Sequence, residues 1–191
     1  MNHEIVKIFY LHKKVLFPHC TINVQLRHSS FSNSLKQGDK ILAFPIKNIF
    51  DILFIKMRIA TLAEITGVAS DNEKINLHLK GLARARVKKI KGIHEASFEI
   101  NSSKSDSADQ ELLKELRKKA QELVFLINVQ ESDRLIELMN FLIELNQITD
   151  FIANYFILDY KLKKDLLNNT DIKSRSNKLL AKLNQLIKRM A

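Results

Sequence analysis

Hydrophobic and polar residues follow two different patterns in the two halves of the chain. Over about the first hundred residues, apolar positions either alternate with polar ones or form short unbroken runs, and both patterns are typical of β-strands. The segments that show these patterns are 7–18, 21–26, 39–46, 57–68, 75–90 and 95–100. Gly81 lies inside the longest segment, where a glycine is typical of a β-bulge. A serine-rich stretch over 29–37, followed by Gly38, predicts one short helix.

Beyond residue 110 the apolar positions recur every three or four residues, which is the period of an amphipathic helix. The first predicted helix has its apolar side chains between Leu112 and Ile127, and the second covers about 133–146. Thr149 or Asp150 is placed to cap a third helix over 151–157, and a fourth covers 159–169. A fifth opens at Asp171 and runs to the end of the chain.

A polar segment separates the two patterns. Residues 101–110, NSSKSDSADQ, contain four serines, two aspartates and no large apolar residue, which is typical of a loop. We therefore predict an α+β protein with a β-rich subdomain over 1–104 and a helical-bundle subdomain over 105–191.

Composition narrows the class of protein. The 191 residues are 46% hydrophobic and 27% charged, which permits a buried core. The single cysteine, Cys20, excludes an internal disulfide and favours a reducing, cytoplasmic location. No apolar run approaches the roughly 18 residues of a membrane span, and the first residues lack the pattern of a secretory signal. We expect no membrane association.

The net charge of +10 is unevenly distributed. Lys and Arg outnumber Asp and Glu by 16 to 8 in residues 1–100 and by 9 to 2 in residues 161–191, whereas residues 101–160 hold 6 against 11. An acidic middle between basic ends suits self-association or an acidic partner. Ordinary solvated, lysine-rich faces explain the same pattern.

The sequence offers no catalytic or cofactor-binding motif. None of the six histidines has a second ligand four residues away on a helix, and the pair His19–Cys20 is far short of four zinc ligands. The four glycines form neither GxxxxGK[ST] nor GxGxxG, and no GxSxG occurs. We expect a protein that is not an enzyme and that needs no cofactor and no metal.

Three basic residues at two-residue spacing, Arg84, Arg86 and Lys88, mark the segment RARVKKIK. In a regular strand they project from one face, so they form a candidate basic surface that could meet phosphates. No aromatic residue is interleaved to stack on bases. A strand face kept charged to prevent aggregation is the alternative interpretation.

The most apolar short segment is NIFDILFIKM, which crowds the apolar run from Ile49 to Ile55 around one acid. Near-continuous apolar runs are typical of buried strands, so this run is a candidate core strand. The second interpretation is an exposed loop that binds unfolded polypeptide or a partner. In the second case we expect apolar contacts from Phe31, Phe50, Leu53 and Phe54.

Four stretches carry a family resemblance. They are LFPHCTINVQL (16–26), DKILAFP (39–45), the strand pair over 59–87 that ends on Gly-Leu and a basic–x–basic–apolar motif, and the helices over 150–187. In the last stretch Asp171-Ile172, Arg175 and the pair Leu179-Leu180 follow in the expected order. Through these segments the chain resembles the N-terminal domain of Lon, the ATP-dependent protease, along nearly its whole length. It departs from that pattern at Ala60, where a glycine is usual, and in NIFDILFIKM, which replaces a polar, proline-bearing loop.

The resemblance implies a PUA-like pseudo-barrel followed by a helical bundle. It implies recognition of unfolded, damaged or tagged proteins, their presentation to a Lon-type ATPase and protease, and formation of a homo-dimer. It does not imply proteolysis, because the Walker loop and the Ser–Lys dyad of Lon lie beyond the matched region. The alternatives are an adaptor or regulator that docks on another protein, and a PUA-like nucleic-acid-binding module, which rests on fold analogy alone and ranks below the others.

Overall fold

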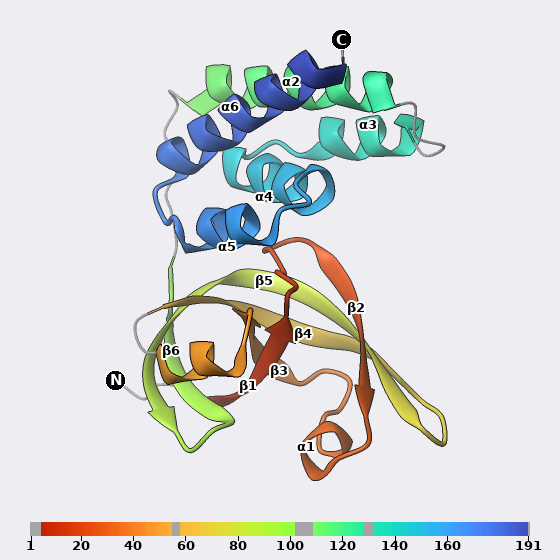
Figure 1. Cartoon of the computed structure of the whole chain (residues 1–191), viewed down its shortest axis with the longest axis vertical. Coiled ribbons are helices and arrows are strands. Elements are labelled where there is room, and N and C mark those ends of the chain that lie inside the picture. Colours follow the sequence, from red (N-terminus) through yellow and green to blue (C-terminus); the bar gives the residue numbers. More distant parts are fainter. Residues whose placement is uncertain (1–4, 55–57, 102–108, 128–131, 191) are drawn as a thin grey trace. The chain divides into compact units, whose positions relative to one another are not determined.

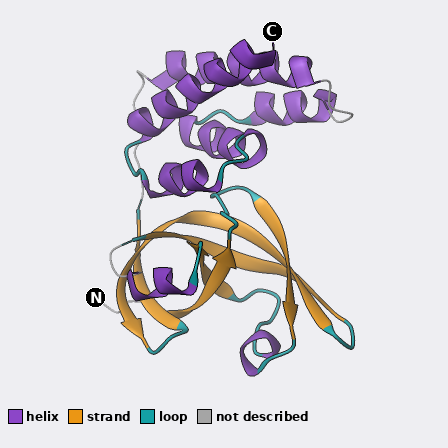
Figure 2. Cartoon of the chain, in the orientation of Figure 1, coloured by secondary structure: helices purple, strands orange, loops and turns teal. Residues whose placement is uncertain are grey.

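The computed structural model describes residues 5–54, 58–101, 109–127 and 132–190 (Figure 1). The chain separates into two compact units, Met1–Ser102 and Ser103–Ala191. The boundary expected between residues 104 and 105 lies outside the described residues. The strands belong to the first unit and the longer helices to the second, so the predicted α+β class is confirmed (Figure 2).

The first unit is built from six strands and two short helices. The strands are β1 (Ile5–His12), β2 (Thr21–Arg27), β3 (Lys40–Ile46), β4 (Ile59–Ser70), β5 (Lys74–Lys91) and β6 (Glu95–Ile100). The helix α1 (Ser30–Asn33) follows β2, and the 3₁₀ helix η1 (Ile49–Phe54) follows β3.

Five of the strands close into a ring. The sheet order is β2-β5-β4-β3-β1-β6, and β6 also pairs with β5. Strand β1 runs parallel to β3, while every other pair in this sheet is antiparallel. Closure leaves β2 as an extra strand on β5 and confirms the predicted pseudo-barrel. A cluster of buried side chains from five strands packs together: Val6, Ile8, Leu42, Phe44, Ile46, Ala60, Leu62, Ala85, Val87, Ala96 and Phe98.

Gly81 marks a bulge, as its place inside a strand predicts. Ala63 pairs with Gly81 but Leu62 pairs with Ala83, so one residue of β5 is skipped. The Gly81 N–H donates to the Cys20 carbonyl at 2.9 Å, and its carbonyl accepts from the His19 N–H at 2.9 Å. A Cβ at this position would lie 2.2 Å from the Phe17 carbonyl oxygen, so only glycine allows the turn after β1 to approach the strand.

The second unit consists, in its described part, of the helices α2 (Asp109–Ile127), α3 (Ser132–Phe141), α4 (Leu145–Phe156), α5 (Tyr160–Asn168) and α6 (Ile172–Met190). Helix α6 begins where predicted, because the Asp171 side chain accepts the Ser174 N–H at 2.6 Å and caps it. No helix in the described part of either unit is both long and apolar enough to cross a membrane.

Two predicted helix boundaries are wrong. The second predicted helix, 133–146, ends at Phe141. The Arg117 side chain of α2 donates to the carbonyls of Met139 (3.2 Å) and Leu142 (2.6 Å), which satisfies acceptors that helix termination leaves open. Thr149 and Asp150 do not cap the next helix, because α4 already begins at Leu145 and both residues are buried inside it.

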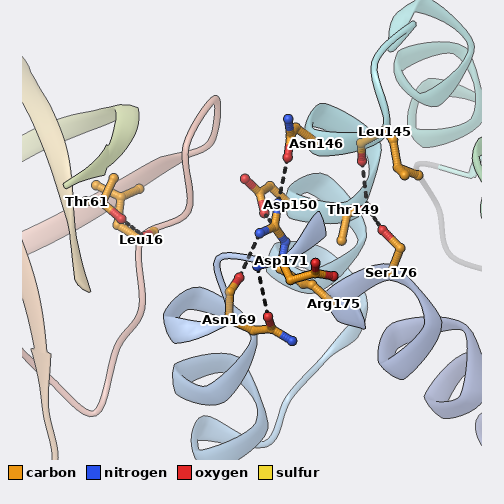
Figure 3. A network of polar contacts seen from close by, with 10 residues as sticks. All are labelled: Leu16, Thr61, Leu145, Asn146, Thr149, Asp150, Asn169, Asp171, Arg175 and Ser176. Carbon is orange, nitrogen blue, oxygen red and sulfur yellow. Dashed lines mark hydrogen bonds and ion pairs between the residues drawn. The ribbon is translucent and has the colours of Figure 1, made fainter. Parts of the chain in front are cut away.

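A buried polar network links α4 with the start of α6 (Figure 3). The Arg175 Nε lies 3.7 Å from Asp150 Oδ1, and both side chains are only 1% exposed. The other Arg175 nitrogens donate to the Asn169 carbonyl and to Asn146 Oδ1, each at 2.8 Å. Beside them, Thr149 Oγ1 bonds the Leu145 carbonyl at 2.6 Å and lies 2.9 Å from the Ser176 hydroxyl.

Candidate functional site

The helix η1 carries the most exposed apolar cluster of the first unit. It follows directly on β3, whose residues from Ile41 to Ile46 are all buried. Asp51 fixes the turn, because its Oδ2 accepts the Lys47 N–H at 2.6 Å and its own N–H donates to the Asn48 carbonyl at 3.1 Å. Ile52 packs against the barrel core. The helix is therefore attached to the barrel through one aspartate and one isoleucine.

Three other apolar side chains of η1 face solvent. Ile49 is 73% exposed, Phe50 is 69% exposed and Leu53 is 75% exposed. A 3₁₀ helix has three residues per turn, so Phe50 and Leu53 lie on the same side of it. We call Ile49, Phe50 and Leu53 the η1 patch. The interpretation of this run as a buried core strand is wrong, because residues 49–54 form a 3₁₀ helix in which these three side chains are exposed and only Ile52 packs, partly buried, against the core.

Of the other two predicted contacts, Phe31 does not join this patch. Phe31 lies on α1, where it is half-buried and its ring stacks on His94 with centroids 4.5 Å apart. A second stacked ring, Phe9, has its centroid 6.4 Å from that of Phe31 and is itself buried. Phe31 therefore covers part of the core on a different element. The side chain of Phe54 lies outside the described residues.

The predicted basic row is not a regular exposed face. Arg84 is only 7% exposed, and Arg86 is half-buried. Lys88 forms an ion pair with Glu99 at 2.5 Å. The register of β5 with β6 also shifts between Val87 and Lys89, so the two-residue spacing is interrupted at Lys88. An irregular pairing and a closed barrel bury or pair side chains that a straight strand would present to a phosphate.

His28, which follows directly on β2, connects α1 with the turn between β4 and β5. The His28 ring lies with Nε2 2.9 Å from the Asp71 carbonyl oxygen and Nδ1 3.0 Å from Asn33 Oδ1. These two hydrogen bonds raise the pKa of His28, since they favour the protonated ring. The pKa of Asp71 is lowered, chiefly because its carboxylate accepts the backbone N–H groups of Glu73 and Lys74. The contacts tie α1 to the β4–β5 turn.

The second unit holds an apolar groove that the sequence analysis did not predict. Its volume is about 500 Å³, and its lining comes from α2, α3, the end of α4, the segment that joins α4 to α5, and α6. The lining residues are Leu123, Ile127, Leu135, Tyr155, Phe156, Ile157, Leu158, Asp159, Lys182, Leu186 and Met190. The apolar period of α6 indicated Leu186 and Met190, but nothing in the sequence showed which helices would surround them.

Within the described ranges, no group of three or more His, Cys, Asp or Glu side chains could hold a metal ion. Cys20, the single thiol, is buried. What the fold presents instead is exposed apolar surface on the barrel and a groove in the helices. These features define a class: a barrel domain joined to a helical bundle, with surfaces suited to binding.

The family follows from the comparison with known proteins. Residues 5–185 match the model of the ATP-dependent protease La (LON) substrate-binding domain. The chain therefore belongs to this family, as its sequence motifs predicted. The match covers the substrate-binding domain, and no ATPase or protease domain is matched. No curated protein matches the chain.

Solved structures share the fold. The N-terminal domain of Mycobacterium avium complex Lon protease is similar with a TM-score of 0.75 at 15% identity, over 95% of this chain and 98% of that one. A Lon N-terminal domain protein from Xanthomonas campestris is similar with a TM-score of 0.60 at 17% identity, over 93% of this chain and 98% of that one. At such identities the likeness concerns the fold alone.

Proposed function

We propose that this chain is a non-catalytic recognition module that binds exposed apolar segments of unfolded or damaged proteins through the η1 patch. The exposure of Ile49, Phe50 and Leu53 on an anchored helix carries this proposal. A folded protein hides its large apolar side chains, whereas an unfolded one offers them. The patch therefore distinguishes unfolded from folded partners and does not require one particular amino-acid sequence.

The expected affinity is modest. Covering about 200 Å² of apolar surface at about 25 cal/mol per Å² gives about 5 kcal/mol, before the cost of association is subtracted. Net binding through this patch alone is therefore weak, and a tight complex needs a second contact or several copies of the domain. Weak, reversible capture suits a module that passes its partner to a separate ATP-dependent protease of the Lon type. A homo-dimer, which stays a prediction, would supply a second copy of the patch.

A denatured model protein tests the proposal. We expect a permanently unfolded, carboxymethylated protein to bind the full chain in a fluorescence-anisotropy titration, and the native form of the same protein not to bind. The double variant Phe50→Asp/Leu53→Asp is expected to weaken binding at least tenfold, because it places charge where apolar contact is needed. Ile143→Asp is the matched control, since Ile143 is as exposed as Ile49, at 73%, but lies in the other unit.

Two results would contradict the proposal. Equal affinity of the wild type and the double variant would show that the η1 patch is not the site. Absence of any binding to the unfolded protein would reject the recognition function itself. An adaptor or regulator that docks on a folded partner would instead copurify with that partner from cells and ignore the unfolded probe.

Nucleic-acid binding finds little support in the arrangement of the basic residues. Arg84 is buried and Lys88 is paired with Glu99, so the predicted row does not present a continuous set of cations. Binding to RNA that weakens steeply between two salt concentrations would nevertheless establish this alternative.

A further inference from the structure

The groove of the second unit, which we call the α6 groove, owes its shape to two rows of side chains on α6. Leu179, Leu183 and Ile187 form one row at four-residue spacing, and all three are buried in the bundle. Lys182, Leu186 and Met190 form the neighbouring row, and all three line the groove. The apolar stripe of α6 is thus wider than the bundle covers, and its second row stays accessible from outside.

The opposite rim comes from the connection between α4 and α5. Ile157 has extended backbone angles (φ −96°, ψ 119°), and so has Asp159 (φ −69°, ψ 118°). In an extended segment successive side chains point to opposite sides. Ile157 is accordingly buried at 1% exposure, while Leu158 is 93% exposed at the groove. A leucine held almost fully in water at the edge of an apolar groove is costly unless something covers it.

The groove is too open for a small molecule to cover. Besides Leu158, Met190 is 51% exposed and Tyr155 is 46% exposed. A compact ligand bound at the bottom of the groove would leave these side chains at its edge exposed to solvent. Apolar surface also continues past the groove on neighbouring positions. Leu126 and Ile127 of α2 are each 42% exposed, and Leu138, one turn after Leu135 on α3, is 41% exposed. A polypeptide segment is long enough to cover the rim and this continuation together.

The charges at the groove select the kind of segment. Among the described residues that line the groove, Lys182 is the one cation, and its Nζ donates to Gln185 Oε1 at 2.9 Å. Arg189 follows Lys182 by two helical turns and so projects from the same side of α6. The one carboxylate in the lining, Asp159, accepts the Leu162 N–H at 2.6 Å and caps α5, so it is already engaged with a helix N-terminus.

We propose that the α6 groove binds a polypeptide segment that presents large apolar side chains next to a carboxylate. The apolar side chains occupy the floor between α2 and α6 and cover Leu158. The carboxylate lies along α6, within reach of Lys182 and Arg189. The proposal rests on the proposed function only in taking a polypeptide as partner, since it concerns the other unit and does not use the η1 patch.

Two labelled synthetic peptides test the proposal on the full chain. Both carry the same leucine and phenylalanine positions, and they differ only in having glutamate or lysine at the flanking positions. We expect the glutamate peptide to bind the wild type at least tenfold more tightly than the lysine peptide in an anisotropy titration. Leu158→Ser should weaken binding of the glutamate peptide at least fivefold, and Lys182→Glu should reverse the preference between the peptides. Ile143→Ser is the matched control and should change neither affinity, since Ile143 is 73% exposed but does not line the groove.

Other outcomes overturn the proposal. Equal binding of the two peptides, or no binding of either, removes the charge selection or the site. If Phe50→Ser abolishes binding and Leu158→Ser does not, the peptide occupies the η1 patch, so the α6 groove proposal is wrong while the proposed function stands. A concentration-dependent dimer that Leu158→Ser dissociates would show that a second copy of the chain covers the groove instead.

Discussion

At the scale of single residues, the buried pair of Arg175 and Asp150 is the most demanding feature of the helical unit. Removing two charges from water costs several kcal/mol per ion, and their attraction offsets this only when the remaining donors are also satisfied. The terminal Arg175 nitrogens donate to Asn169 and Asn146, which come from different segments of the chain, while its Nε faces Asp150 at 3.7 Å. The arginine therefore fixes the end of α5, the start of α4 and the start of α6 to one another.

Replacing this arginine should destabilise the helical unit strongly. We expect Arg175→Met to lower the free energy of unfolding by about 3–5 kcal/mol, because it leaves the Asp150 carboxylate buried without its cation. The double variant Arg175→Met/Asp150→Leu should recover much of that loss. Urea denaturation followed by circular dichroism measures both values. A loss below about 1 kcal/mol in the single variant would mean that water or another group replaces the arginine.

His28 gives the chain a small dependence on pH. Because folding raises the pKa of His28 above its ordinary value of 6.5, its contribution to stability is complete below that value and is lost as the pH rises through the folded pKa. We expect the unfolding temperatures of the wild type and His28→Gln to differ more at pH 5.5 than at pH 8.5. The NMR titration of His28 should also shift to lower pH in Asn33→Ala. A difference that grows with pH would contradict this assignment.

At the scale of elements, the close approach at Gly81 holds the turn after β1 against β5. Gly81→Ala should destabilise the barrel by about 1–3 kcal/mol, because its Cβ meets the backbone of Phe17, which cannot rotate away as a side chain could. Gly67→Ala is the matched control in the same sheet, since its Cβ would lie at an ordinary 3.4 Å from the His78 ring. Equal unfolding midpoints for the two variants in urea would show that the turn moves at no cost.

Elements could be predicted from the sequence where the signal is local. Asp171 caps α6 through its own next turn, so one aspartate before an apolar period was enough. The end of α3 could not be predicted, because Arg117 comes from another helix. Burial of Arg84 likewise depends on barrel closure and on the irregular pairing at Lys88.

The candidate site could likewise be predicted only in part from the sequence. Phe50 and Leu53 were proposed as contacts from composition, but whether the run from Ile49 faced the core or solvent required the structure. The α6 groove was missed because its walls come from five segments that only the tertiary fold brings together. The apolar period of α6 indicated Leu186 and Met190, but Leu158, a leucine between the buried Ile157 and a helix cap, is indistinguishable in the sequence from a core residue.

At the scale of the whole molecule, each unit has its own buried core and its own position at which a substitution should destabilise it. The barrel core is composed of strand residues and Gly81 lies within its strands, whereas Arg175 lies within the helices. Substitutions at Gly81 and Arg175 should consequently destabilise different units of the chain. The division of the chain at residue 102 places every contact used in these arguments inside one unit or the other.

Hydrogen–deuterium exchange tests this independence. In Gly81→Ala we expect faster exchange in peptides from β4 and β5 and unchanged exchange in α4 and α6, with the converse pattern in Arg175→Met. The reason is that local opening requires breaking only the contacts of the affected unit. Faster exchange in both units from either single variant would show that they unfold as one cooperative body. If the units open independently, a partner can bind the barrel through the η1 patch while the α6 groove keeps its structure. The groove is then available for a second contact, which a tight complex needs when capture at one site is weak.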